Sequence, residues 1–329
     1  MRLVDGGMTV DLSPVGAMIA DVTVDMDGRR LAPFFRNPWR GDPRPMDELT
    51  RNLGAEWPCV PFGVTEAPGT LPDDWRTDAP PAPWHRHAHG HAAHGDWTLT
   101  RIDDRTAEAR IEYPGDSPIA RLWRRIALHA PGDIRCALGI EVRRAVSIPL
   151  GLHPVLSLAG SAPGDALLEI AGNGTAWTFP VDVEPGRSHL VPDQRGVPLS
   201  TLAGQDGARV DGYRLPFGTR NEDLVLLTEP GGIVGLRHPD SGYRVSVHWD
   251  HEALPCCLLW LSNGGRDGGP WDGRVRALGV EPVAAPFDLG PAHATAVSTP
   301  LARHGIRTAV ALIPEQPWRT DYTLRVGPC

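Results

Sequence analysis

Apolar and polar residues alternate along many short stretches of this chain. In the segment ARIEY, Ala109, Ile111 and Tyr113 fall on one side and Arg110 and Glu112 on the other. A period of two is typical of a half-buried β-strand. The segment YRVSVHW at 243–249 follows the same pattern. Apolar runs of this kind predict strands at 18–24, 107–113, 119–128, 134–143, 166–170, 224–227, 232–236, 243–249, 256–261, 308–313 and 322–326.

Turn-forming residues separate these runs throughout the chain. The 34 prolines and 37 glycines leave little room for long helices, and many short strands between turn signals indicate a sandwich or a barrel. We therefore predict an all-β protein built as a large antiparallel β-sandwich, with a short helix at 291–302. The stretch 64–84 is rich in Pro, Asp and Thr. Because strand-like sequence continues on both sides, we interpret this stretch as a surface loop of a single domain spanning 1–329.

Composition narrows the classes of function. The formal net charge is −8 and no basic block occurs, which argues against nucleic acid or an anionic membrane as partner. All 32 basic residues are arginine, so Schiff-base and Walker-type lysines are excluded. The five cysteines are odd in number and form no CxxC pair, which favours reduced thiols. The first residues lack the apolar core of a signal peptide and no long apolar run follows, so we expect a cytoplasmic protein.

A histidine-rich run at 83–97, PWHRHAHGHAAHGDW, is the first candidate for chemistry. His85, His87, His89 and His91 alternate, and on a strand they would project from one face. Clustered imidazoles can bind zinc or copper. Because no matching cysteine or acidic ligand set is recognisable elsewhere, we favour the interpretation that one or two of these histidines are functional and that no metal is bound.

Three short stretches in a fixed order extend this picture. They are HGHAAHGDW at 89–97, GLHPVLSL at 151–158 and LGVEPVAAPFD at 278–288. In this order they resemble the aldose 1-epimerase (galactose mutarotase-like) family. The first is similar to the HGFARxRPW pattern of the hexose-6-phosphate epimerase-like branch, but Ala93 and Gly95 stand where that branch has basic residues. Arginine forks are the usual way to hold a phosphate, so their loss favours a sugar without phosphate.

The resemblance implies a galactose mutarotase-like supersandwich that needs no cofactor. It also implies roles for three residues. Glu281 would be the base on the C1 hydroxyl of a sugar, His153 the acid at the ring oxygen, and His89 a hydrogen-bond donor near these oxygens. The second stretch departs from the family's His-Pro-Tyr-Phe, because Val155 and Leu156 replace the two aromatic residues.

Four further residues are candidates for binding the sugar. Arg51 precedes the segment WPCVPFG at 57–63, which resembles a loop of the family. Asp223 precedes an apolar strand where the family often has an aspartate that binds sugar hydroxyls. Trp97 and Trp260 are candidates for an apolar platform against a sugar face, although any single one of the eleven tryptophans is more often a core residue.

The sequence therefore predicts an aldose 1-epimerase that interconverts the anomers of a free sugar by general acid–base ring opening, with a small-molecule sugar as its partner. Two alternatives from other classes remain open. The first is a non-catalytic carbohydrate-binding or sensing protein of the same fold. The second is a metal-dependent enzyme that uses histidines of the 85–94 run. A lyase or hydrolase on the same sandwich also remains open, since a fold does not fix a reaction. Oligomeric state is not encoded in these patterns.

Overall fold

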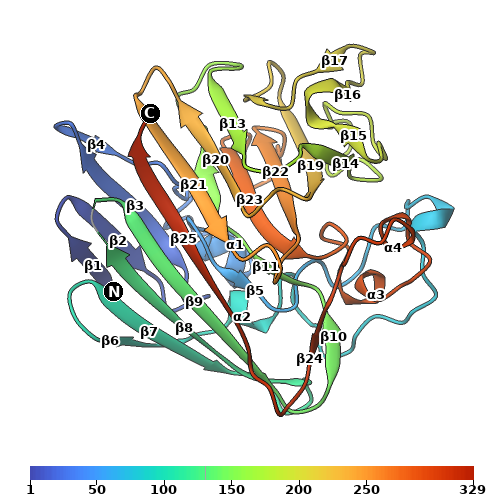
Figure 1. Ribbon diagram of the computed structural model, residues 1–329, viewed down its shortest axis with the longest axis horizontal. Helices are drawn as coiled ribbons and strands as arrows, with labels where there is room; N and C mark the ends of the chain where they lie inside the picture. The colour runs from blue at the N-terminus through green and yellow to red at the C-terminus, as the bar shows by residue number, and fades with distance from the viewer. Residues whose placement is uncertain (130) are drawn as a thin grey trace.

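Two large antiparallel sheets form the body of the protein (Figure 1). The computed structural model describes residues 1–129 and 131–329. The nine-stranded sheet has the order β18-β13-β20-β21-β25-β9-β8-β7-β6. Its strands are β6 (Thr98–Arg101), β7 (Thr106–Glu112), β8 (Ile119–His129), β9 (Asp133–Val142), β13 (Ala166–Ile170), β18 (Arg214–Leu215), β20 (Ile233–His238), β21 (Tyr243–Trp249) and β25 (Trp318–Pro328).

The eight-stranded sheet has the order β15-β14-β19-β22-β23-β11-β5, with β12 also paired to β23. Its strands are β5 (Pro58–Cys59), β11 (Leu150–Leu152), β12 (Val155–Ser157), β14 (Thr175–Thr178), β15 (Val197–Pro198), β19 (Asn221–Thr228), β22 (Cys256–Asn263) and β23 (Arg276–Ala284). The long central strands β19, β22 and β23 pair in continuous register, so side chains on one face of each strand form rows across the sheet.

Smaller elements complete the chain. An N-terminal four-stranded sheet contains β1 (Arg2–Asp5), β2 (Met8–Leu12), β3 (Ile19–Met26) and β4 (Arg29–Leu31); two-stranded pairs are β10 (Val146–Ile148) with β24 (Val310–Leu312) and β16 (Leu202–Ala203) with β17 (Arg209–Val210). The helices are short: α1 (Glu48–Asn52), α2 (His91–His94), α3 (Pro291–Ala294) and α4 (Pro300–Arg303), with 3-10 turns at Asp73–Trp75 and Leu199–Thr201.

The main core lies between the two large sheets. Leu122 and Ile126 of β8 belong to the same buried cluster as Val225 of β19 and Leu259 of β22. Each strand contributes every second residue, as the alternation in the sequence requires. The prediction of an all-β antiparallel sandwich is confirmed by these sheets.

The outer face of the eight-stranded sheet carries a second apolar cluster. It includes Leu224 and Leu226 of β19 and Leu258 and Trp260 of β22, which alternate with the residues of the main core. Loops cover this face, bringing buried aromatic residues from distant segments: Trp39, Trp57, Phe62, Trp75 and Phe287. Because both faces are covered, β19 is buried along its whole length, which explains the unbroken apolar run at 224–227.

The predictions for individual strands, the helix and the loop agree with the structure to different degrees. Every predicted strand overlaps an observed one. The single helix predicted at 291–302 is wrong, because the structure has two separate helices there, α3 and α4. The second helix has its own N-terminal residues: the Thr299 side chain caps α4, and Pro300 occupies its first helical position. The segment 64–84 is a largely exposed loop, but Leu71 and Trp75 anchor it in the core. The single-domain organisation stays a prediction.

The cysteines do not approach one another closely enough in the structure to pair. All five are unpaired, and only Cys329 is exposed. Among the described residues, no helix has the length and apolar character needed to cross a bilayer.

Candidate active site

His153 lies at a break between two short strands. Leu152 ends β11 and Val155 begins β12, so His153 and Pro154 interrupt one edge of the eight-stranded sheet. The backbone remains fixed there, because the His153 amide donates to the Trp57 carbonyl at 2.9 Å and the Pro154 carbonyl accepts from the Val280 amide at 2.8 Å. A residue before proline favours extended backbone, which suits the break at His153.

Glu281 lies opposite this break on the neighbouring strand. This strand, β23, runs from Arg276 to Ala284 and contains both Glu281 and Pro282. Proline has no N–H to donate, so it normally ends a ladder. Here Pro282 lies where the neighbouring strand is interrupted, between the pairs Val155–Gly279 and Gly151–Val283. No ladder bond is lost on that side, and β23 runs through the glutamate.

The two side chains meet. Nε2 of His153 lies 3.4 Å from Oε1 of Glu281, and both residues are buried. Gly279 makes room for this contact: a Cβ atom there would lie 2.4 Å from Oε1 of Glu281 and 2.9 Å from Cβ of Trp260. The glycine two residues before the glutamate therefore sets where the carboxyl group lies.

His89 reaches the same place from the histidine-rich run. It adopts a left-handed backbone with φ of 61°, uncommon for a non-glycine residue, and its amide donates to the Gly63 carbonyl at 2.8 Å. Gly90 must be glycine, because a Cβ there would lie 2.1 Å from the Val60 carbonyl oxygen. The His89 ring lies edge-on to that of His153, with centroids 5.3 Å apart.

A cavity of about 420 Å³ opens onto these three side chains. Its aromatic walls are Trp57, which stacks on His153 with ring centroids 4.0 Å apart, Trp260 and Trp271. Charged side chains also line it: Asp47, Arg86, Arg266 and Asp288. The volume is within the range of small-ligand sites, which are apolar pockets with a few convergent polar groups.

Burial perturbs the proton affinities of the site. Loss of solvent, with Asp288 adding a smaller effect of the same sign, raises the pKa of Glu281 well above its ordinary value. Loss of solvent lowers the pKa of His153 well below its ordinary value, and that of His89 to about 3. Burial also raises the pKa of Asp288 to about 6. Such groups gathered in one cavity are typical of acid–base sites.

These directions bear on the roles of the contacting pair. Burial disfavours the charged form of each group, so the shifts favour a protonated Glu281 beside a neutral His153. This is the reverse of the roles implied by the resemblance. Ring opening and ring closure exchange the acid and the base, so a pair that holds one proton can begin from either arrangement.

Three residues expected to bind the sugar lie elsewhere. The Arg51 guanidinium faces the 37–44 segment, where it donates to the carbonyls of Asp42 and Arg44 at 3.3 and 3.4 Å. Asp223 points to the opposite side of β19 and accepts from the amides of His189 and Leu190. Trp97 is buried and donates to the Ala92 carbonyl at 2.8 Å. None of the three lines the cavity, whereas Trp260 does.

Other cavity residues escaped the sequence analysis. Asp288 is the last residue of the segment LGVEPVAAPFD, which also contains Glu281. Its acidic side chain in that segment was the sequence feature from which it could have been predicted. Arg266 and Trp271 belong to the glycine-rich loop after β22. The Arg266 guanidinium lies 4.5 Å from the centroid of the Trp271 ring and 3.0 Å from Glu222. A glycine-rich loop gives no periodicity from which these contacts could be inferred.

The histidine-rich run is not a strand, so its histidines do not share a face. His85 lies 3.2 and 3.1 Å from the carbonyls of Gly63 and Val64, and His94 lies 3.0 Å from that of Ala88. His91 begins the helix α2. Within residues 1–129 and 131–329, no group of three or more His, Cys, Asp or Glu side chains is arranged to hold a metal ion.

Comparison with known proteins places the fold. No family model and no curated protein matches the sequence. Solved structures do match along the whole chain. A candidate aldose 1-epimerase from Escherichia coli K12 superposes with a TM-score of 0.66 at 17% identity, covering 100% of this chain and 98% of that one. A galactose mutarotase-like protein from Lactobacillus casei gives 0.63 at 13% identity, covering 99% of each. An aldose epimerase homologue from C. elegans gives 0.61 at 15% identity, covering 100% and 98%.

These structural similarities establish the fold of the chain. The chain has the galactose mutarotase-like β-sandwich fold that its three sequence stretches implied. At such identities the shared architecture does not carry an activity with it, so the chemistry is argued from the cavity.

Proposed function

We propose that this protein is an isomerase of the aldose 1-epimerase type, which interconverts the anomers of a free sugar. Its substrate occupies the cavity above β19, β22 and β23. The observation that carries the proposal is the contact between His153 and Glu281, 3.4 Å apart and buried at the floor of a sugar-sized cavity.

The reaction takes a proton from one oxygen of the hemiacetal carbon and gives a proton to the other. The base removes the proton of the C1 hydroxyl while the acid protonates the ring oxygen, and the bond between C1 and the ring oxygen breaks. Rotation about C1–C2 followed by closure yields the other anomer. Both oxygens are attached to the same carbon, so the acid and the base must be near neighbours. The spacing of His153 and Glu281 meets this condition.

The pair carries a single proton through the cycle. Whichever member is protonated acts as the acid, and the other takes the hydroxyl proton. The proton count of the protein is therefore the same before and after each ring opening, and no cofactor enters the scheme. His89 approaches His153 from the side, where it can hydrogen-bond one of the reacting oxygens.

The surrounding charges favour a neutral sugar. Each arginine of the cavity already has an acidic partner: Arg266 pairs with Glu222, and Arg86 pairs with Asp116. Unpaired arginine forks are what a phosphate group needs. Asp288 lines the cavity and is suited to accept hydrogen bonds from sugar hydroxyls, the role that the sequence had suggested for Asp223.

Polarimetry on a panel of fresh single-anomer aldoses tests the proposal. The wild type should accelerate mutarotation, and His153→Asn and Glu281→Gln should each lose about 10²–10⁴-fold of that acceleration. His238→Asn is the matched control, because His238 is also 6% exposed and also stacks on an aromatic ring, that of Tyr243, on the other large sheet. Equal rates in all four proteins would refute the role of the pair. Saturation-transfer NMR that detects binding without anomer exchange would favour the carbohydrate-binding alternative.

A further inference from the structure

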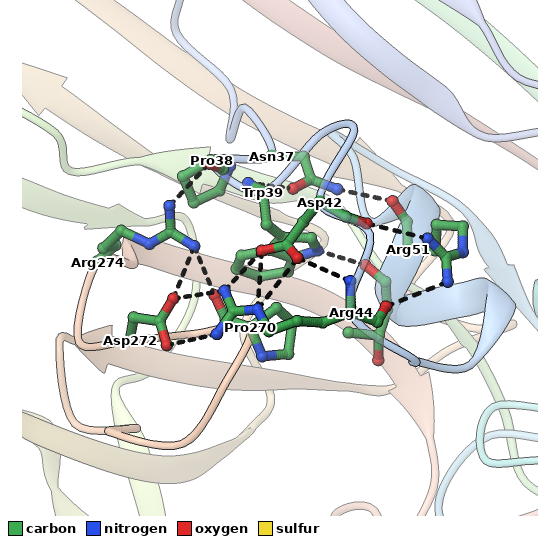
Figure 2. Close-up of polar contacts among 10 residues, drawn as sticks. Asn37, Pro38, Trp39, Asp42, Arg44, Arg51, Pro270, Asp272 and Arg274 are labelled. Atoms are coloured by element: carbon green, nitrogen blue, oxygen red, sulfur yellow. Dashed lines mark hydrogen bonds and ion pairs between the residues drawn. The ribbon is translucent and has the colours of Figure 1, made fainter.

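The segment 37–44 forms a bracket behind one wall of the cavity (Figure 2). It is tied to α1 by four hydrogen bonds. Asn37 Nδ2 donates to the Arg51 carbonyl at 2.9 Å, and Trp39 Nε1 donates to the Thr50 carbonyl at 2.8 Å. In return, the Arg51 guanidinium donates to the carbonyls of Asp42 and Arg44. Because Asp47, Leu49 and Thr50 line the cavity, the bracket holds this wall from behind.

The same bracket is tied to the loop that carries Trp271. Arg44 reaches Asp272 through two hydrogen bonds of 3.0 and 2.6 Å, and it also pairs with Asp42 at 2.6 Å. Arg274 donates to the Pro38 carbonyl at 3.1 Å and to Asp272 at 3.0 Å. Figure 2 shows Asp272 between the two guanidinium groups. Two aspartates and two arginines therefore join segments that are more than 200 residues apart in sequence.

Two aromatic residues connect this network to the cavity. Trp39 is buried in the bracket and contacts Trp271 edge-on, with ring centroids 4.8 Å apart. Trp271 lines the cavity, and the Arg266 guanidinium lies over its ring at 4.5 Å. Asp272 is the next residue after Trp271, so the ion pair with Arg44 acts one residue away from the aromatic wall.

We propose that the Arg44–Asp272 contact positions Trp271 and Arg266 as the recognition wall for the sugar ring, and thereby sets substrate affinity without taking part in proton transfer. This inference rests on the proposed function. Glu281 stands on β23, and His153 lies in the two-residue break between β11 and β12, which both pair with β23. Trp271 stands on a loop that has no strand partner. The wall therefore depends on the bracket for its position, and the reacting pair does not.

The chemistry of the bracket makes it sensitive to salt but not to moderate pH. Hydrogen bonds from Arg44 lower the pKa of Asp42 to about 2 and also lower the pKa of Asp272. Both carboxylates therefore stay charged near neutral pH. The four side chains are substantially exposed or lie at the surface, so added salt screens their attraction.

Asp272→Asn and Arg44→Gln remove the contact from its two sides. Asparagine suits position 272, where the backbone φ is +48°, because it tolerates this conformation as aspartate does. The matched control is Asp133→Asn, which breaks a comparable two-bond Arg–Asp contact, to Arg325 at 2.7 and 2.8 Å, between β9 and β25. Asp133 and Arg325 do not line the cavity.

Two measurements are made on each protein: the kinetics of anomer interconversion and hydrogen exchange of the peptide covering 264–275. The proposal predicts a severalfold rise in KM with kcat within about twofold of the wild type, together with faster exchange in this peptide, for both bracket variants and not for the control. Unchanged KM with unchanged exchange would overturn it, as would a fall in kcat at constant KM. If the wild type shows no interconversion of anomers, the proposed function fails. The positioning role of the Arg44–Asp272 contact is then judged by hydrogen exchange alone, and exchange of the 264–275 peptide that stays as slow in both bracket variants as in the wild type would overturn it.

Discussion

Replacing Gly279 by alanine should separate the two groups of the reacting pair. The added Cβ would lie 2.4 Å from Oε1 of Glu281 and 2.9 Å from Cβ of Trp260. Both distances are shorter than real Cβ contacts, so one neighbour has to move. Trp260 is held by the continuous pairing of β22 with β23. The terminal carboxyl group of Glu281 is the freer of the two, so it should rotate away from His153.

The size of the effect follows from what the pair contributes. A well-placed acid or base supplies about 10²–10⁴-fold of rate, and a carboxyl group pushed beyond hydrogen-bond reach should lose a large part of it. Overpacking a buried site costs about 1–3 kcal/mol of folding stability, which leaves a domain of this size folded. Activity should thus fall far more than stability.

The assay is polarimetric mutarotation with chemical denaturation run in parallel. Gly327→Ala is the control, since Gly327 also lies in a strand, β25, and nothing lies within 4 Å of a Cβ placed there. A Gly279→Ala protein that is folded and as active as the wild type would refute the claim that the carboxyl position at the His153 contact matters.

Three further predictions concern proton affinity and buried charge. Glu281 keeps its proton to higher pH in the folded protein than in the unfolded chain, so the wild type loses stability as pH rises above the ordinary carboxyl range and through the raised pKa. Glu281→Gln should remove this loss, and denaturation midpoints should show the variant increasingly more stable than the wild type from pH 5 to pH 8; a constant difference would contradict the raised pKa. Asp288→Asn removes a neighbouring negative charge that raises the pKa of Glu281, so the alkaline limb of the pH–kcat profile should move to lower pH, and a shift to higher pH would be the wrong sign. Glu56→Gln leaves the Arg124 guanidinium, now paired with Glu56 at 2.6 Å and with Tyr322 at 2.8 Å, without its buried counter-charge, and urea unfolding should show a loss of about 3–5 kcal/mol. A loss below 1 kcal/mol would mean that the network is replaceable by neutral hydrogen bonds.

The reacting pair was predictable because short sequence patterns surround it. The His-Pro step separates β11 from β12, and the Glu-Pro step of β23 lies opposite this break in the sheet. The order of the segments and their resemblance to a family pattern made both residues candidates. Their contact is a long-range event set by the register of β11, β12 and β23, which no single segment encodes.

The residues that line the cavity were harder to predict, because successive residues of a strand lie on opposite faces of the sheet. Asp223 and Glu222 are adjacent in β19 and point to opposite faces. Glu222 faces the cavity side, where it accepts from Trp260 Nε1 at 2.6 Å, while Asp223 faces away. In a strand buried on both faces, apolar alternation gives no clue to which face is which. The actual walls come from loops such as the one carrying Trp271, whose positions depend on distant contacts with Arg44.

Exchange NMR of the anomeric protons at equilibrium tests the central claim most directly, because it measures interconversion without a starting excess of either anomer. The wild type should transfer magnetisation between the α and β signals of at least one free aldose, and His153→Asn and Glu281→Gln should abolish the transfer while His238→Asn retains it. Transfer that persists undiminished in both site variants would contradict a shared proton between His153 and Glu281 as the source of catalysis.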